Sequence, residues 1–167
     1  MQFTVSRDAL IKPLQLVSGV VERRQTLPVL SNILLVLKDS ELSLTGTDLE
    51  VELVGRVTVE PGGESGAITL PARKLVDICK SLAEGSELSI SQKDDKVSIK
   101  SGRSRFTLMT LPASEFPTIE DEAGTFSLTI EQPKLKELLD STAVAMAKQD
   151  DRYYLNGMLF AVAQDYL

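Results

Sequence analysis

Residues 68–82 read Ile-Thr-Leu-Pro-Ala-Arg-Lys-Leu-Val-Asp-Ile-Cys-Lys-Ser-Leu, a stretch in which a short apolar run changes into a helical pattern. From Ala72 to Leu82 the apolar residues recur at three- and four-residue spacing, which places them on one face of a helix. Pro71 suits the first turn of that helix, because a residue there has no intrahelical partner for its N–H. The stretch therefore predicts a strand over 68–70 followed directly by a helix over 71–82.

The same strand-to-helix pattern recurs elsewhere in the chain. Val5–Leu10 aligns with Leu70–Leu75, and positions 3–35 align without a gap with positions 128–160. Any two units of this kind share an apolar phase, so a chance similarity is the alternative to a true repeat. Helices are predicted at 7–21, 71–82 and 132–147.

Short alternating apolar runs lie between the predicted helices and predict strands. Turn signals such as Lys38-Asp39-Ser40, Thr45-Gly46-Thr47 and Asp94-Asp95 separate them. The element order β-α-β-β-β, followed by the same order again, indicates an α+β fold. The predicted strands span 33–37, 42–44, 51–59, 68–70, 88–90, 97–99 and 106–111.

These repeats predict how the chain divides into domains. We expect residues 1–120 to form a complete domain, 121–125 an acidic linker, and 126–167 the start of a second copy with one strand, one helix and a further strand. A piece as short as 126–167 cannot close a core of its own. The sequence is therefore expected to be a fragment of, or a truncated relative of, a longer multidomain protein.

The composition excludes several classes of protein. The 167 residues include no His and no Trp, and the formal net charge is −6. Cys79 is the single cysteine, which rules out an internal disulfide, suits a reducing cytoplasm, and lies on the apolar stripe of a predicted helix. No signal peptide or membrane span is recognisable. A cytoplasmic protein without a membrane partner, catalytic residue, cofactor or metal is expected.

One acidic row is the best candidate for an active site. Asp48, Glu50 and Glu52 alternate along one predicted strand, and such carboxylates can bind Mg²⁺ or act as acid and base. A row of this kind is more typical of the solvated side of an antiparallel strand, with Leu49, Val51 and Leu53 facing inward. We therefore keep a metal-dependent enzyme only as a remote alternative.

Basic residues are concentrated on the predicted helices, whereas the strands and turns hold most of the acidic residues. Helices that lie together would present a positive surface, and phosphate contacts of this kind need no sequence readout. Ordinary solvated helix faces are the alternative. The candidates on the first two helices are Lys12, Arg73, Lys74 and Lys80.

Two loops and one strand add further candidates. Arg23 and Arg24 follow the first helix, and residues 148–154 follow the third helix, with cations that can hold phosphate and two tyrosines that can stack on bases. The alternative is that these tyrosines lead into a strand core. The loop candidates are Lys148, Gln149, Arg152, Tyr153 and Tyr154.

A final basic cluster surrounds an apolar pair near the predicted strand 106–111. Lys96, Arg103 and Arg105 lie beside Phe106 and Leu108, an arrangement that suits a subunit interface. It suits a charged guard against edge pairing equally well.

Several motifs, taken in order, closely resemble the bacterial beta sliding clamps, the processivity subunits of DNA polymerase III. The resemblance covers residues 1 to about 160. The motifs are Phe3-Thr4-Val5, Lys12-Pro13-Leu14, residues 26–30 (TLPVL), 42–49 (LSLTGTDL), 71–74 (PARK), 101–106 (SGRSRF), Leu111-Pro112, Phe116-Pro117 and 152–158 (RYYLNGM).

The resemblance implies a DNA-clamp fold, in which each domain consists of two β-α-β-β-β halves with helices on one side and antiparallel sheets on the other. Two chains of three such domains form a homodimer ring around duplex DNA. The ring tethers the replicative polymerase for processive DNA replication, binds polymerase and clamp-loader subunits, and is not an enzyme.

The resemblance also implies roles for single residues. Arg24 and Arg73 would contact duplex DNA, and the 148–154 loop would contact single-stranded DNA through Gln149, Tyr153 and Tyr154. Of the groove for partner peptides only Leu155 would be present. A truncated clamp that caps full-length subunits is the alternative function. The implied subunit interface comprises Lys74, Lys96, Arg103, Arg105, Phe106 and Leu108.

Overall fold

The computed structural model describes residues 1–21, 27–119 and 127–163. The chain divides into two compact units, Met1–Glu120 and Asp121–Leu167, and each is described by itself. The predicted linker 121–125 lies outside the described residues. No described helix has the length and apolar character that crossing a membrane requires.

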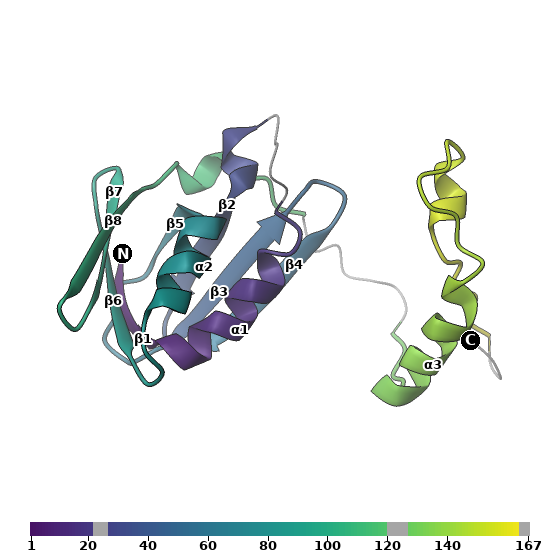
Figure 1. Ribbon diagram of the computed structural model, residues 1–167, viewed down its shortest axis with the longest axis horizontal. Coiled ribbons are helices and arrows are strands. Elements are labelled where there is room, and N and C mark those ends of the chain that lie inside the picture. Colours follow the sequence, from purple (N-terminus) through teal and green to yellow (C-terminus); the bar gives the residue numbers. More distant parts are fainter. Residues whose placement is uncertain (22–26, 120–126, 164–167) are drawn as a thin grey trace. The chain divides into compact units, whose positions relative to one another are not determined.

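In its described residues, the first unit combines two α-helices with two four-stranded antiparallel sheets, ordered β1-β6-β7-β8 and β4-β3-β2-β5. Helices α1 and α2 lie side by side over one face (Figure 1), so the predicted α+β fold with helices on one side of antiparallel sheets is confirmed. The elements are β1 (Gln2–Ser6), α1 (Arg7–Val17), β2 (Asn32–Lys38), β3 (Glu41–Thr47), β4 (Glu52–Thr58), β5 (Gly66–Pro71), α2 (Ala72–Ser81), β6 (Glu87–Lys93), β7 (Lys96–Ser101) and β8 (Ser104–Met109).

The two β-α-β-β-β halves exchange their first strands. Strand β1 of the first half pairs with β6 of the second half, where Phe3 lies opposite Ile90. Strand β5 of the second half pairs with β2 of the first, where Ile33 lies opposite Leu70. Each helix therefore begins directly after a strand that joins the sheet of the other half, and neither half can complete its sheet alone.

The main core fills the space between the helices and the sheets. Leu10 and Leu14 of α1, together with Leu75 and Cys79 of α2, are fully buried in it. A smaller cluster around Leu34 and three other buried residues is separate from this core. Its members come from the 3-10 turn Pro28–Ser31, from β2 and from the segment after β8: Val29, Leu30, Leu34 and Phe116.

Helix α1 ends at Val17, earlier than the predicted end at Val21. Both the backbone N–H and the hydroxyl of Ser18 donate to the carbonyl of Leu14, at 3.0 and 2.6 Å. A serine that bonds back in this way competes with the next helical turn. Ser18 therefore ends the helix one turn before the apolar pattern ends at Val21.

The predicted turn at 45–47 is wrong, because β3 continues to Thr47 and the chain reverses over residues 48–51. Gly46 is inside the strand for a packing reason. A Cβ built on Gly46 would lie 2.3 Å from the backbone oxygen of Val17, so only glycine lets the end of α1 approach β3 this closely.

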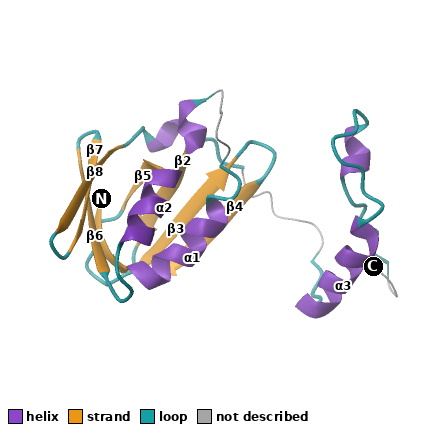
Figure 2. Ribbon diagram, viewed as in Figure 1, coloured by secondary structure: helices purple, strands orange, loops and turns teal. Residues whose placement is uncertain are grey.

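The second unit contains α3 (Gln132–Ala143) and the 3-10 turn η3 (Tyr153–Asn156). The predicted strands before and after α3 are absent from residues 127–131 and 157–163, which have no strand structure (Figure 2). A strand needs hydrogen-bonding neighbours, and the described part of this unit supplies none. Helix α3 also ends before the predicted Ala147, whose N–H donates to the carbonyl of Leu155 instead.

Candidate nucleic-acid interface

Arg7 joins the start of α1 to the end of α2. Its Nε donates to the carbonyl of Cys79 at 3.1 Å, and its Nη1 donates to Asp8 at 2.8 Å. A cation at the C-terminal end of a helix is favourable, because the last carbonyls carry partial negative charge. The Arg7 guanidinium lowers the pKa of Asp8, whose other oxygen accepts from the N–H of Gly85 at 2.9 Å. The two helices are therefore fixed together.

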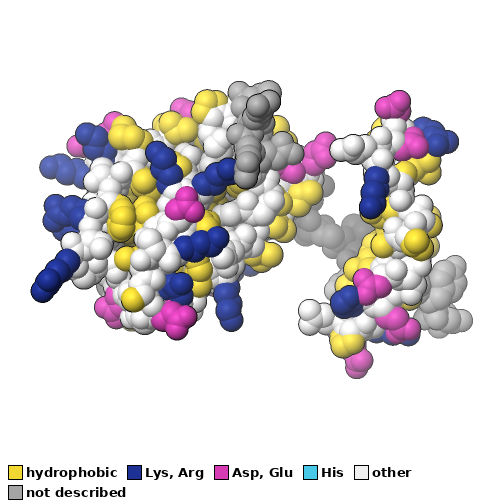
Figure 3. All heavy atoms as spheres, viewed as in Figure 1, with side chains coloured by type: hydrophobic (Ala, Val, Ile, Leu, Met, Phe, Trp, Pro, Cys, Tyr) yellow, Lys and Arg dark blue, Asp and Glu magenta, His cyan; other side chains and the backbone are white. Residues whose placement is uncertain are grey.

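The outer side of these helices carries four exposed cations, Lys12 of α1 and Arg73, Lys74 and Lys80 of α2, which we call the basic helix face. Apart from Asp8, which pairs with Arg7, Asp77 is the only acidic residue on either helix. Figure 3 shows Lys and Arg side chains gathered over α1 and α2, with few acidic ones among them. The structure thus brings these four predicted residues onto two adjacent helices.

Arg73 and Lys74 occupy the first turn of α2, which contains no acidic residue. The first turn of a helix already carries partial positive charge from its unpaired N–H groups, and proteins usually place acidic residues there. Two cations at this position concentrate positive potential instead. Such a helix start attracts phosphate.

Arg24 and its neighbour Arg23 lie outside the described residues. Their predicted role as DNA contacts therefore stays a prediction.

The loop 148–154 is held by one carboxylate. Asp150 accepts from the backbone N–H of Arg152 at 2.9 Å and from the Arg152 side chain, and Asn156 bonds the backbone of Asp150 twice. The pKa of Asp150 is lowered by these contacts, the side-chain bond from Arg152 first. Gln149 adopts a left-handed backbone with φ of 57°. The loop is therefore a defined structure that its own hydrogen bonds hold in place.

The two tyrosines of this loop are turned toward solvent. Tyr153 is 82% exposed and Tyr154 is 66% exposed, so the alternative that they enter a strand core is wrong. Their rings meet edge to face, with centroids 5.9 Å apart. Lys148 and Gln149 are exposed beside them. Exposed aromatic rings next to a cation are suited to stacking on bases.

Strand β8 is the last strand of its sheet and carries the predicted interface cluster. Lys96, Arg103 and Arg105 are exposed as predicted, but Leu108 is only 7% exposed and belongs to the main core. Phe106 is half-buried and packs against the same core. The outward side chains of β8 are Arg105, Thr107 and Met109. The apolar pair predicted for the interface therefore faces inward because side chains alternate along a strand.

The acidic row does not share a strand face. Asp48 lies in the turn before β4, where its carboxylate accepts from the N–H groups of Glu50 at 3.0 Å and Val51 at 2.7 Å; the Val51 bond is the main cause of its lowered pKa. Leu49 has a φ of 81°, and both Leu49 and Val51 are exposed, so their predicted inward orientation is wrong. Across the described ranges, no three acidic or cysteine side chains converge in a way that could hold a metal ion.

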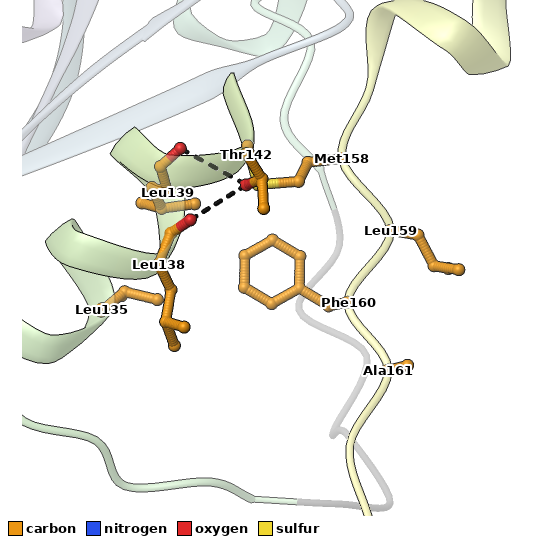
Figure 4. Close-up of a pocket in the computed structure, with 8 residues that line it drawn as sticks. All are labelled: Leu135, Leu138, Leu139, Thr142, Met158, Leu159, Phe160 and Ala161. Carbon is orange, nitrogen blue, oxygen red and sulfur yellow. Dashed lines mark hydrogen bonds between the residues drawn. The ribbon is translucent and has the colours of Figure 1, made fainter. Parts of the chain in front are cut away.

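An apolar hollow lies beside α3 in the second unit (Figure 4). Leu138 and Leu139 line it from the helix, and the Phe160 ring points into it from the opposite segment. The hydroxyl of Thr142 is occupied by the carbonyls of Leu138 and Leu139, at 2.9 and 3.4 Å. The hollow offers no convergent polar groups and is an uncovered apolar surface.

Comparison with known proteins gives a consistent result. The family model for the DNA polymerase III beta subunit, N-terminal domain, matches residues 1–120. The chain is 60% identical over 167 residues to the beta sliding clamp of Pseudomonas putida, covering all of this chain and 46% of that protein. It is 51% identical over 160 residues to the beta sliding clamp of Escherichia coli K12, covering 96% and 44%.

Solved structures agree with these matches. The crystal structure of the DNA polymerase III subunit beta from Pseudomonas aeruginosa is similar with a TM-score of 0.91 at 62% identity, covering 95% of this chain and 43% of that one. The Caulobacter crescentus pol III beta structure gives 0.88 at 39% identity, covering 94% and 42%. The chain thus spans less than half the length of these relatives.

Proposed function

Because the chain belongs to the DNA polymerase III beta subunit family, whose model matches residues 1–120, we propose that it supplies the first domain and the start of the second domain of a sliding clamp. Such a clamp encircles duplex DNA and tethers the replicative polymerase for processive synthesis. Its role is binding, without catalysis.

The basic helix face is the observation that carries this proposal. In a chain of net charge −6, α1 and α2 together hold five basic and only two acidic residues, and one of those acids is paired with Arg7. A positive surface of this kind attracts the phosphate backbone without reading base sequence, so a protein can slide along the duplex. The acidic remainder of the surface repels DNA.

The proposed DNA contacts differ between the two units. Lys12, Arg73 and Lys80, with Arg24 beyond the described residues, contact the duplex. In the second unit, Lys148 and Gln149 contact single-stranded DNA, and Tyr153 and Tyr154 stack on its bases. Arg152 takes part in the same loop mainly by holding its shape through Asp150.

The proposed subunit interface lies along β8 and the start of α2. Lys74, Lys96, Arg103 and Arg105 pair with acidic residues of a partner chain in a homodimer ring, and Phe106 and Leu108 support β8 from inside. Polymerase and clamp-loader subunits are the other proposed partners, and Leu155, which is 36% exposed, is the one residue of their groove that this chain supplies.

The proposal is tested by DNA binding of the 167-residue chain. Fluorescence anisotropy with a labelled duplex that has a single-stranded overhang should show weak binding that is lost as salt rises. The triple variant K12A/R73A/K80A should bind at least tenfold more weakly than the unchanged chain. The variant K38A/K93A/K100A removes the same charge from strand residues and serves as the matched control.

An equal loss in both triple variants would show that overall charge, and not the basic helix face, attracts DNA. Binding that does not depend on salt would contradict the proposal as well.

A second candidate function is a regulator that caps full-length clamp subunits. The outer edge of β8 pairs with no other strand among the described residues, which favours this candidate because an unpaired strand edge can bind another chain. The test is whether this chain, added to a full-length relative such as the P. aeruginosa protein, opens its dimer in native mass spectrometry. An unchanged dimer would contradict the regulator function and leave the clamp as the single proposed function.

A further inference from the structure

Asn156 lies directly before Gly157 at the end of the 3-10 turn η3, and the proposed function makes no use of this pair. The side-chain carbonyl carbon of an asparagine can be attacked by the backbone nitrogen of the next residue, and glycine has no Cβ to hinder that approach. Asparagine is one of the thermolabile residues of proteins. The pair is therefore a candidate site of chemical modification.

The fold does not require a glycine at position 157. Its φ is −112°, which any residue can adopt. A Cβ built there would have the carbonyl oxygen of Tyr154 as its nearest contact, at 3.9 Å, and Gly157 is exposed to solvent. The missing Cβ therefore affects the reactivity of Asn156 more than the packing of the second unit.

Asn156 closes the 148–154 loop with both ends of its side chain. Its Oδ1 accepts from the N–H of Asp150 at 3.0 Å, and its Nδ2 donates to the carbonyl of Asp150 at 3.0 Å. The carboxylate of Asp150 in turn holds the side chain of Arg152. Because the Asn156 amide is half-buried and bonded at both ends, its reaction follows local opening of the loop.

Asn32, the other asparagine of the chain, lies in the opposite environment. Its side chain is 5% exposed and donates to the hydroxyl of Thr69 at 2.9 Å. The next residue is Ile33, which is β-branched and fully buried in the core. Asn32 is therefore an internal reference that should keep its amide while the first unit is folded.

We propose that Asn156 is a site of spontaneous deamidation and that the reaction releases the 148–154 loop. The backbone nitrogen of Gly157 forms a bond to the side-chain carbon of Asn156, and the bond from that carbon to Nδ2 breaks. The proton of the Gly157 N–H leaves with Nδ2 as ammonia. Water then opens the cyclic imide to aspartate or to isoaspartate, so water is the one co-reactant that the reaction needs.

The product cannot hold the loop as the amide does. An ionised carboxylate only accepts hydrogen bonds, so the carbonyl of Asp150 loses its donor and faces an oxygen in the place of Nδ2. The new negative charge also lies close to Asp150, whose carboxylate holds Arg152. Isoaspartate adds a carbon to the main chain at this point. The inference goes beyond the proposed function, because it does not require the loop to bind DNA.

The first test is incubation of the 167-residue chain at mildly alkaline pH, followed by peptide mapping with mass spectrometry. Asn156 should lose its amide while Asn32 keeps it. Gly157→Ala should slow the loss by about tenfold, because its Cβ hinders the attacking nitrogen. Circular dichroism should show the same fold for this variant and the unchanged chain. An Asn156 that keeps its amide, or that loses it equally fast in Gly157→Ala, would overturn the proposal.

The second test uses Asn156→Asp, which carries one of the two products in every molecule. Trypsin should cut it after Lys148 and Arg152 about fivefold faster than the unchanged chain, because a loosened loop opens more often. Gln132→Glu is the matched control, since it makes the same amide-to-acid change at the exposed start of α3. Equal cleavage of the two variants would overturn release of the loop. Because no DNA is present, failure of the loop to bind DNA leaves both tests unaffected.

Discussion

Arg152 and Asp150 form a two-point ion pair in which Nε and Nη2 of the arginine each lie 3.0 Å from a different oxygen of the carboxylate. The pair raises the pKa of Arg152 and lowers that of Asp150. The charge of this arginine is therefore compensated before any phosphate approaches. Arg73, exposed in a helix turn without acidic residues, has no such compensation among the described residues.

This difference predicts unequal effects on DNA binding. Arg73→Ala should reduce the slope of log binding constant against log salt by about 1, because one phosphate contact and its released counterion are lost. Arg152→Ala should change the slope by less than half as much. Anisotropy titrations at several salt concentrations measure both. Equal slope changes would show that Arg152 leaves Asp150 when DNA binds.

Releasing Arg152 from its ion pair with Asp150 should have the opposite effect on the salt dependence of DNA binding. Asp150→Asn removes the compensating charge and keeps a side chain of the same shape, so the salt slope should become steeper than in the unchanged chain. Asn156→Ala is the companion variant, since it loosens the loop without changing charge. A slope that Asp150→Asn leaves unchanged would mean that Arg152 stays away from phosphate even when it is free.

Leu108 should behave as a core residue in spite of its place in the implied subunit interface. Leu108→Ala is expected to lower the free energy of unfolding of the first unit by about 2–4 kcal/mol, as for other buried leucines. Met109→Ala, its 53% exposed neighbour on the same strand, should change it by less than about 0.5 kcal/mol. Urea denaturation followed by circular dichroism measures both, and similar values would contradict the inward orientation of Leu108.

Gly46 should not tolerate even one additional carbon. Gly46→Ala brings a Cβ within 2.3 Å of the Val17 backbone oxygen, and backbone cannot move aside as a side chain can. We expect a loss of about 3 kcal/mol in unfolding free energy. Gly157→Ala is the control, because its nearest atom would lie at 3.9 Å. A thermal melt that shows equal stability for both variants would be inconsistent with this contact.

Cys79 should resist thiol reagents while the first unit is folded. Burial raises its pKa from 9.0 to about 11, so the reactive thiolate is scarce at neutral pH and the sulfur is also inaccessible. Ellman's reagent should therefore react at least a hundredfold more slowly with native protein than with protein in denaturant. Rapid native labelling would show that α2 opens locally.

The same thiol makes stability depend on pH in alkaline solution. Its pKa is higher in the folded state than in the unfolded state, so the unfolded chain loses the proton first. The contribution of the protonated thiol to the free energy of unfolding is fully present below pH 9. It is lost as pH rises toward about 11, at no more than about 1.4 kcal/mol per pH unit. Denaturation of Cys79→Ala should lack this part of the alkaline decrease, and an identical pH profile in both proteins would contradict it.

Local sequence patterns predicted the elements that depend only on residues close to one another in the sequence. The helix over 71–82 needs only its apolar face and the proline before it, and the structure places it at Ala72–Ser81. The end of α1 and the position of Gly46 depend on how close a helix comes to a strand, and no pattern in the sequence records that distance. The strands predicted around α3 were wrong because a strand forms only where partners exist.

The residues of the candidate site also divide into those that local patterns predict and those whose position depends on the folded backbone. Charge counts along each helix were enough to find the basic helix face, because exposure on an amphipathic helix follows from its period. The inward orientation of Phe106 and Leu108 was not predicted, although the polar residues Arg105 and Thr107 alternate with them along the same strand. The pairing of Arg152 with Asp150 was not predicted, since it depends on a loop backbone that brings the N–H and the side chain of Arg152 to the same carboxylate.

The exchange of first strands between the two halves has a consequence for synthesis on the ribosome. Phe3 emerges well before its partner Ile90, which is made only after most of the first unit. Until β6 has left the exit tunnel, β1 has no strand to pair with, and α1 has only part of its core. The first unit should therefore fold late and in one step as translation passes β8, and a nascent chain stalled before Lys93 should remain sensitive to protease.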